Sequence, residues 1–225
     1  METFNNARLM MTGVERVEHA VKIFEKAAKL AKQELKRSEQ MAKPHEQSFC
    51  VGLAAYEVRE YDAAIAFLST AFQMAPLAPT AALLALSYWR IDDFSNAESW
   101  IKQAIAISPN GEHHAKLLGE NISYLALYSA IHLAQGKIDA ASSTVATALE
   151  HKAEPLSLRV RAHVLLAQGK GDEALKSLDE GIANMPKNVA LTELHLERKL
   201  VSDLIGARVE VTPFFSVSRV GSWPD

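Results

Sequence analysis

Two short stretches contain residues that could support metal or acid–base chemistry. Glu112, His113 and His114 are consecutive, and carboxylate and imidazole groups are ligands for zinc. Adjacent residues on a helix point about 100° apart and rarely chelate one ion, so we interpret them as solvated residues at the start of a helix. Asp92 and Asp93 are also adjacent, and such a pair is typical of a turn. We therefore expect no metal site and no acid–base pair at either stretch.

Nucleophilic and nucleotide-binding chemistry has no support in the sequence. Cys50 is the only cysteine, which excludes an internal disulfide and a multi-cysteine metal site and favours a buried thiol that fills core space. The chain has no GxSxG nucleophile elbow, GxxxxGK phosphate loop, HExxH motif or glycine-rich nucleotide turn. The sequence predicts a protein without catalytic residues or cofactors, and not an enzyme.

Composition and charge narrow the possible partners. The chain has 24 Lys and Arg against 27 Asp and Glu, a net charge of −3, and therefore lacks the basic surface that binds nucleic-acid phosphates. Hydrophobic residues make up 48% of it, enough for a sizeable core.

The first 19 residues lack the apolar stretch of a signal peptide, and the longest apolar run, 122–134, is too short to span a bilayer. We expect a cytoplasmic protein with no nucleic-acid binding and no membrane insertion.

A repeat of 33 residues organises the chain. The pentapeptide LAQGK begins at Leu133 and again at Leu166, and 166 − 133 = 33. Pairs of small residues, seven positions apart, recur four times with steps of 33, 44 and 33. The first members are Ala64, Ala97, Ala141 and Ala174, and the second members are Ala71, Ala104, Ala148 and Gly181. Such a period predicts a solenoid of stacked repeats.

Each repeat is predicted to contain two helices. Apolar residues recur at intervals of three and four on both sides of a short polar break, such as Arg59-Glu60 in the first repeat. In LAQGK the break contains Gly136 or Gly169, which can adopt a positive φ and end the first helix. The longer step of 44 equals 33 + 11, and eleven residues are close to three helical turns. We therefore predict that the third repeat has a lengthened helix.

This pattern resembles the tetratricopeptide repeat family, whose motif combines three small residues with a later proline. The matching sets are Gly52-Ala64-Ala71-Pro76, Ala85-Ala97-Ala104-Pro109, Ser129-Ala141-Ala148 without its proline, and Ala162-Ala174-Gly181-Pro186. The resemblance implies an all-α, right-handed superhelical solenoid of antiparallel helix pairs. Four repeats would cover about 45–77, 78–111, 112–154 and 155–188.

The segment 1–44 is predicted to form a long amphipathic helix ahead of the repeats. Thr12 and Glu15 have the spacing of a capping box, and Pro44 ends the helix. An apolar stripe continues through Val14, Val17, Val21, Phe24, Ala28, Ala31 and Leu35. One interpretation is a degenerate half-repeat that caps the solenoid, in which Ala20, Phe24 and Ala27 match a second helix. The other is a homodimer that associates through Val14, Val17, Val21 and Phe24.

Two segments follow the repeats. Residues 189–206 carry Val201 and Leu204 on one side and end at Gly206, as expected of a capping helix. The tail 207–225 alternates apolar residues in a pattern typical of an extended strand. Because its aromatic side chains are costly to leave in water, we expect the tail to dock on its own molecule, to dock on another subunit, or to order when a partner binds.

In the tetratricopeptide repeat family the first helices line a concave groove, and the resemblance assigns candidate partner-binding residues to it. They are Phe49, Leu53, Tyr56, Leu86, Trp89, Arg90, Leu133, Arg159, His163 and Leu166. Tyr56 and Trp89 are favoured because their polar tips suit a partly wet surface. Family members that grip a terminal carboxylate use Lys, Asn and Arg at such places. Only Arg90 and Arg159 are of that type here, which disfavours a carboxylate clamp.

Two functional hypotheses remain open. The first is a non-enzymatic adaptor or chaperone that holds an apolar segment of a partner protein in the groove, similar in outline to the small tetratricopeptide chaperones of bacterial type III secretion. The second is a structural subunit of a homo- or hetero-oligomer, whose groove is filled by its own N-terminal helix or C-terminal tail. Neither hypothesis identifies the partner protein.

Overall fold

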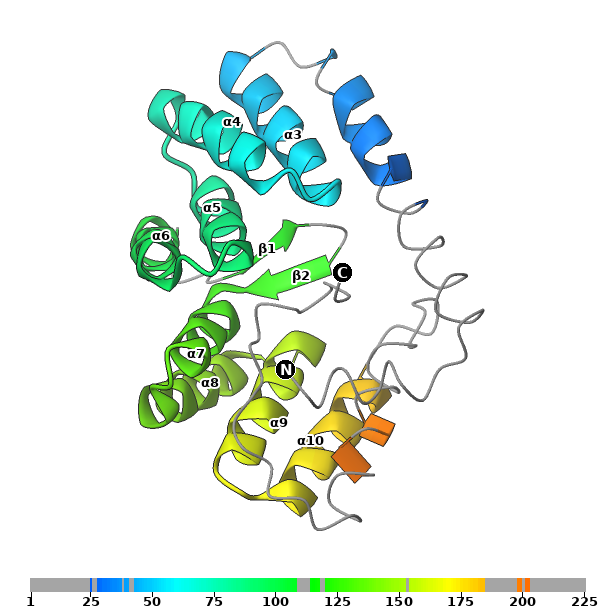
Figure 1. Cartoon of the computed structure of the whole chain (residues 1–225), viewed down its shortest axis with the longest axis vertical. Helices are drawn as coiled ribbons and strands as arrows, with labels where there is room; N and C mark the ends of the chain where they lie inside the picture. The colour runs from blue at the N-terminus through cyan, green and yellow to red at the C-terminus, as the bar shows by residue number, and fades with distance from the viewer. Residues whose placement is uncertain are drawn as a thin grey trace. The chain divides into compact units, whose positions relative to one another are not determined.

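The computed structural model describes residues 25, 28–37, 39–40, 43–108, 114–117, 120–152, 154–184, 198–199 and 201–202. The chain divides at Tyr124 into two compact units. One unit contains helices α3 to α6 and a β-hairpin, and the other contains α7 to α10 (Figure 1). In both units the helices pack as consecutive antiparallel pairs, which confirms the predicted helix-pair architecture in the described residues.

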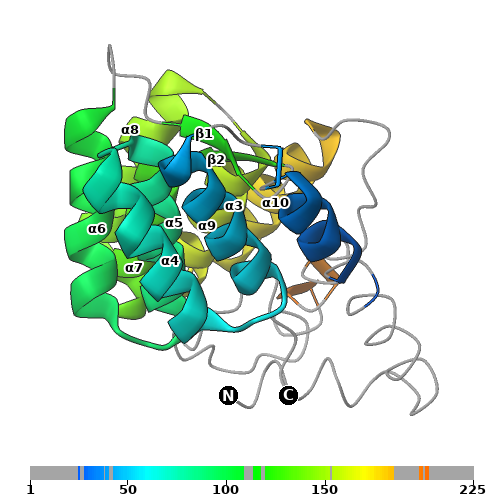
Figure 2. The ribbon, with the colours of Figure 1, turned by 90° about the horizontal axis from the view of Figure 1, so that it is seen from above.

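The first unit is built from two helix pairs. Helix α3 (Pro44–Glu57) pairs with α4 (Tyr61–Met74), and α5 (Ala78–Arg90) pairs with α6 (Phe94–Ile107). Figure 2 shows the helices from a second direction. Proline starts α3 and stands in the first turn of α5, where its missing N–H leaves no helical hydrogen bond unmade.

The second unit repeats the arrangement. Helix α7 (Tyr124–Ala134) precedes α8 (Ile138–His151), and α9 (Pro155–Ala167) pairs with α10 (Gly171–Ala183). Buried serines tie each pair together. The Ser129 hydroxyl on α7 donates to the Ala141 carbonyl at 2.7 Å, and the Ser177 hydroxyl on α10 donates to the Leu158 carbonyl at 2.7 Å. These bonds satisfy polar groups at the places where the helices approach closely.

Small residues occupy the helix crossings, as the repeat pattern predicts. Ala64, Ala97, Ala141 and Ala174 are all 0% exposed. At the crossing of α3 and α4, a Cβ added to Gly52 would lie 2.7 Å from Cγ of Leu68, closer than packed carbon atoms tolerate. The period in the sequence therefore records where two helix backbones must come close.

The turn between the two helices of each repeat has a residue with positive φ. These residues are Arg59 (67°), Asp92 (60°), Gly136 (74°) and Gly169 (76°). They are separated by 33, 44 and 33 positions, so all four occupy the same place in the repeat. The prediction for the two glycines is confirmed. The first two repeats make the same turn with Arg59 and Asp92. Because these residues have a Cβ, a positive φ strains their backbone.

We expect Arg59→Gly and Asp92→Gly each to stabilise the protein by roughly 0.5–1 kcal/mol, because glycine adopts positive φ without steric cost. Gly169→Ala should destabilise it by a similar amount, since open space around that Cβ site leaves only the backbone term. Urea denaturation followed by circular dichroism measures both changes. A loss of stability in Arg59→Gly would show that the arginine side chain contributes more than its backbone strain costs.

The predicted lengthening of a helix in the third repeat is wrong. Residues of the insertion instead form an antiparallel hairpin of β1 (His114–Leu117) and β2 (Glu120–Ser123), with Leu117 opposite Glu120. His114 thus belongs to a strand and not to the start of a helix, and α7 begins only at Tyr124. Two residues, Leu118 and Gly119, separate the strands, and a two-residue connection with glycine is typical of tight hairpins. Strand β1 packs against α5.

Part of the predicted N-terminal helix is described. Residues 28–37 are helical and Ala31 is buried. The prediction that this helix continues to Pro44 is wrong, because a turn at residues 39–40 follows it and Pro44 starts α3. Ala31 lies 64 − 31 = 33 positions before Ala64, which extends the period of the repeat by one further step. The segment lies against α3, where Glu34 is a hydrogen-bonding neighbour of the Cys50 thiol. The capping box and Val14, Val17, Val21 and Phe24 lie outside the described residues.

At the other end, residues 198–199 and 201–202 are helical. Val201 is buried, and the Arg198 guanidinium binds the Asp179 carboxylate of α10 through both Nε and Nη2. The pair raises the pKa of Arg198 and holds this helical segment against α10. The tail 207–225 lies outside the described residues, so its predicted strand character stays a prediction.

Candidate protein-binding surface

Asp92 and Asp93, which suggested acid–base chemistry, have structural roles, whereas Glu112 and His113 lie outside the described residues. Asp93 caps α6: its Oδ1 accepts from the Asn96 backbone N–H at 3.1 Å, and its Oδ2 accepts from the Asn96 side-chain amide at 2.6 Å. These hydrogen bonds lower the pKa of Asp93. Asp92 supplies the positive-φ turn. Among the described residues, no group of three or more His, Cys, Asp or Glu could hold a metal ion.

Cys50 is a buried core thiol, as predicted. Burial on α3 raises its pKa to about 11, and the nearby Glu34 carboxylate adds to the shift because it repels a thiolate. A thiol with a raised pKa is largely protonated at neutral pH, and the protonated form is a poor nucleophile. Cys50 therefore contributes packing between α3 and the helical segment 28–37.

On α3 and α5, the candidate residues form a contact between successive first helices. The Arg90 Nε donates to the Tyr56 hydroxyl at 2.9 Å, and the guanidinium carbon lies 5.8 Å from the Tyr56 ring centroid. Tyr61 of α4 packs its ring edge-on to Tyr56 at 5.5 Å. Tyr56 is buried, whereas Phe49 and Arg90 keep partial exposure. This arrangement fixes a cation and an aromatic ring together at the ends of two first helices.

Trp89 is not at the partly wet surface that the sequence suggested. Its side chain is 1% exposed, and its Nε1 is buried without a hydrogen-bond partner. Leu53 and Leu86 are buried too. The reason is that α5 is covered by α3, α4 and α6 and also by strand β1 of the hairpin. These side chains therefore belong to the core of the first unit as the structure shows it.

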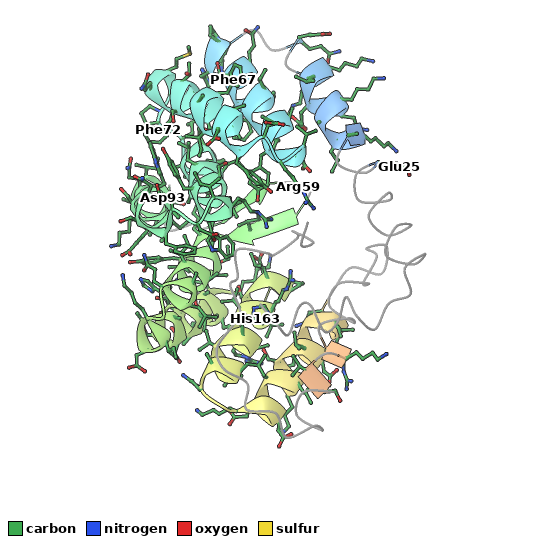
Figure 3. All side chains as sticks on the ribbon, viewed as in Figure 1. Glu25, Arg59, Phe67, Phe72, Asp93 and His163 are labelled. Atoms are coloured by element: carbon green, nitrogen blue, oxygen red, sulfur yellow. The ribbon has the colours of Figure 1, made fainter. Side chains whose placement is uncertain are left out.

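The candidates of the second unit are all buried. Leu133 lies on α7, and Arg159, His163 and Leu166 lie on α9, where Figure 3 labels His163. No residue of α9 is exposed along its length. Ser157, Arg159 and His163 give this helix an unusual set of buried polar groups.

An apolar surface on a second helix was not predicted from the sequence. Phe67 and Met74 on α4 and Leu77 after it are exposed, although all are large and hydrophobic. The signal was present, because residues 63–74 contain no ionisable side chain. The predicted site residues all belonged to first helices, where the family's groove lies, and this feature is on a second helix.

Comparisons with known proteins agree with the fold. The chain superposes on the crystal structure of a thermophilic TPR protein from Thermus thermophilus with a TM-score of 0.61 and 18% sequence identity. The alignment covers 83% of this chain and 93% of that one. A search of curated protein sequences finds no match. Among the described residues, no helix is long and apolar enough to cross a membrane.

The sequence profile of the tetratricopeptide repeat matches residues 52–112 and 131–189, which together make up more than half of the chain. These matches include Gly52, the four buried alanines at the helix crossings and both glycines of the LAQGK turns. Domains built from such repeats are in general protein–protein interaction modules. The profile match, the helix pairs and the spacing of small residues show that the chain belongs to the tetratricopeptide repeat family.

Proposed function

We propose that the protein is a non-enzymatic interaction module, an adaptor or chaperone that holds an extended apolar segment of a partner protein against its first helices. The observation that carries the proposal is strand β1 lying against α5. A first helix that is apolar from Ala81 to Leu86 already accepts an extended chain on its surface. A partner segment of similar shape would use the same surface, with Phe49 and Arg90 at its accessible edge.

The energetics favour moderate affinity. Burying a large apolar side chain is worth roughly 1.5–3 kcal/mol, but Leu86 and Trp89 are already buried in the first unit. A partner segment that replaces the hairpin gains only the difference between its own contacts and those of β1. Association also costs translational freedom and side-chain ordering. We therefore expect binding in the micromolar range for a short peptide.

A peptide-binding experiment tests the role of the first helices. The probe is a fluorescent ten-residue peptide that alternates valine or leucine with serine and lysine, titrated into the purified chain. Phe49→Ala and Arg90→Ala should each weaken binding by about fivefold or more, because each removes a contact at the accessible edge of the site. The matched control is Phe67→Ala, the same substitution on the second helix α4. Equal losses in Phe49→Ala and Phe67→Ala would contradict the proposed site.

A second candidate is favoured by the same hairpin. If the hairpin fills the groove permanently, the chain is a structural subunit whose first helices are covered by its own residues. Replacing residues 112–121 by a short glycine–serine linker separates the two candidates. An adaptor should bind the peptide more tightly and stay folded, whereas a self-filled groove should lose stability, measured by urea denaturation, and gain no affinity.

A further inference from the structure

The contact between α4 and α6 shows how second helices of successive repeats stack. Phe72 of α4 and Trp100 of α6 pack edge to face, with ring centroids 5.0 Å apart and an interplanar angle of 85°. One repeat earlier, the counterpart of Trp100 is Phe67, because 100 − 33 = 67. Phe67 and Phe72 are five residues apart and therefore about 140° apart around α4, on different flanks of the helix (Figure 3). Helix α4 thus has one ring on each flank.

The flank that contains Phe67 is open in the described structure. Phe67 is 44% exposed and Met74 is 53% exposed, whereas Trp100 is partly covered by Phe72. At helical spacing, these residues share one face of α4 with three smaller ones. We call this the α4 face, and it consists of Ala63, Ala66, Phe67, Thr70 and Met74. The α4 face thus resembles one side of a helix-stacking contact, and no helix of the described residues packs on it.

The chain's own preceding helix does not cover the α4 face in the described residues. That helix, residues 28–37, lies against α3, with Glu34 beside Cys50, and the blue segment in Figure 1 lies next to α3. Its Ala28 and Leu35 are themselves exposed. A covering group must therefore come from another molecule or from residues outside the described part of the chain.

We propose that the α4 face binds the same face of a second copy of this chain, with the two α4 helices antiparallel about a two-fold axis. Residues 63–74 have no ionisable side chain, so the face offers nothing to a charged ligand and matches an equally neutral surface. A two-fold contact is self-complementary. Phe67 of each copy lies near the small Ala66 and Thr70 of the other.

The antiparallel direction follows from charge. Asp62, in the first turn, is the only residue of α4 that is charged at neutral pH. A parallel pair would bring two Asp62 carboxylates together, whereas an antiparallel pair centred between Phe67 and Thr70 places each Asp62 near Ala75 of the other copy. The antiparallel arrangement also aligns each helix N-terminus with the C-terminus of its partner, which is favourable for the helix dipoles.

Light scattering after size-exclusion chromatography tests the dimer. The wild-type chain should elute with twice the monomer mass at micromolar concentration, and Phe67→Glu should elute as a monomer. The control is Ile107→Glu, at a residue that is 39% exposed on α6 and is the counterpart of Met74, because 74 + 33 = 107. It should remain a dimer. A monomeric wild type up to about 100 μM, or equal dissociation in both variants, overturns the proposal. Circular dichroism verifies that each variant is folded.

Disulfide trapping gives a second readout that does not depend on a disruptive substitution. Cys50 is buried and its raised pKa makes it a poor nucleophile, so an engineered surface cysteine reacts first. With copper phenanthroline as the oxidant, Thr70→Cys should form a disulfide-linked dimer. The control is Thr147→Cys on α8, which matches Thr70 after steps of 33 and 44 and also donates to the carbonyl four residues earlier. Equal cross-linking of both variants contradicts the α4 dimer.

The dimer and the peptide site fail or succeed independently. The peptide titration depends on Phe49 and Arg90 of the first helices, and the dimer depends on Phe67 of a second helix. If the α4 face binds a partner protein and not a second copy, the wild type should be monomeric, and neither Thr70→Cys nor Thr147→Cys should form a disulfide-linked dimer. This result overturns the dimer.

Discussion

Trp89→Ala is expected to lower the free energy of unfolding by about 3–5 kcal/mol, because it removes a fully buried aromatic side chain and leaves a cavity. Trp89→Phe should cost much less, about 1 kcal/mol or below. The phenylalanine keeps most of the apolar contacts, and it removes an indole N–H that is buried without a hydrogen-bond partner. Urea denaturation monitored by circular dichroism gives both values.

The control for this pair is Trp100→Ala on α6. Trp100 is only partly buried and packs edge to face with Phe72, so its truncation should cost about 1–2 kcal/mol. If Trp89→Phe destabilised the protein as much as Trp89→Ala, the indole N–H would have to make an important hydrogen bond, and Trp89 would not be a purely apolar core residue.

The second large effect is expected at Gly52. Replacing glycine by alanine in a helix normally stabilises it by about 1 kcal/mol, but here the new methyl group would lie 2.7 Å from Cγ of Leu68, with the Leu68 backbone nitrogen at 3.2 Å. Leu68 is 0% exposed, so its side chain cannot turn away into solvent without disturbing the packing of α3 and α4. We expect Gly52→Ala to destabilise the protein by about 2 kcal/mol, the usual range for overpacking.

A double-mutant cycle identifies the cause. Leu68→Ala alone should cost about 2–5 kcal/mol, and in its presence Gly52→Ala should cost nothing or stabilise the protein, because the methyl group then fills the vacated volume. The coupling between the two substitutions should be about 1–3 kcal/mol. Additive effects would mean that Gly52 is needed for its backbone and not for the close approach of α3 and α4.

The repeat core could be predicted from the sequence because it depends on single residues. Where two helices cross, only a small side chain fits, so Ala64, Ala97, Ala141 and Ala174 identify the crossings without knowledge of their neighbours. The turns were predictable for a similar reason. Gly136 and Gly169 mark positive φ, although the same turn at Arg59 and Asp92 has no such mark.

The hairpin could not be predicted from length alone. Eleven inserted residues fit three helical turns as well as two short strands. The glycines at 111 and 119 argue against a continuous helix. They are a stronger indication than the fit of eleven residues to three helical turns. The sequence also does not identify the segment that covers the first helices. The apolar pattern at Leu86 and Trp89 shows only that these side chains must be covered.

The open flank at Phe67 could be recognised only in part from the sequence, because the lack of ionisable side chains in residues 63–74 does not show which side of α4 is left uncovered. Phe67 looks like an ordinary apolar residue until it is aligned with Trp100, whose ring is packed against Phe72 of the preceding repeat. Only the stacked structure shows that one ring has a neighbour and that its counterpart is exposed. In repeat proteins, comparison of equivalent positions therefore finds surfaces that hydrophobic periodicity does not.

The stacking of Phe72 on Trp100 makes residues 44–76 a portable cassette. These 33 residues contain α3, α4 and a ring on each flank of the second helix. A duplicate spliced ahead of Pro44 would bring its own phenylalanine onto the original Phe67, in the same way that Phe72 now meets Trp100. The array can thus be elongated in steps of one cassette. The number of side chains available to a bound chain then increases with the number of cassettes.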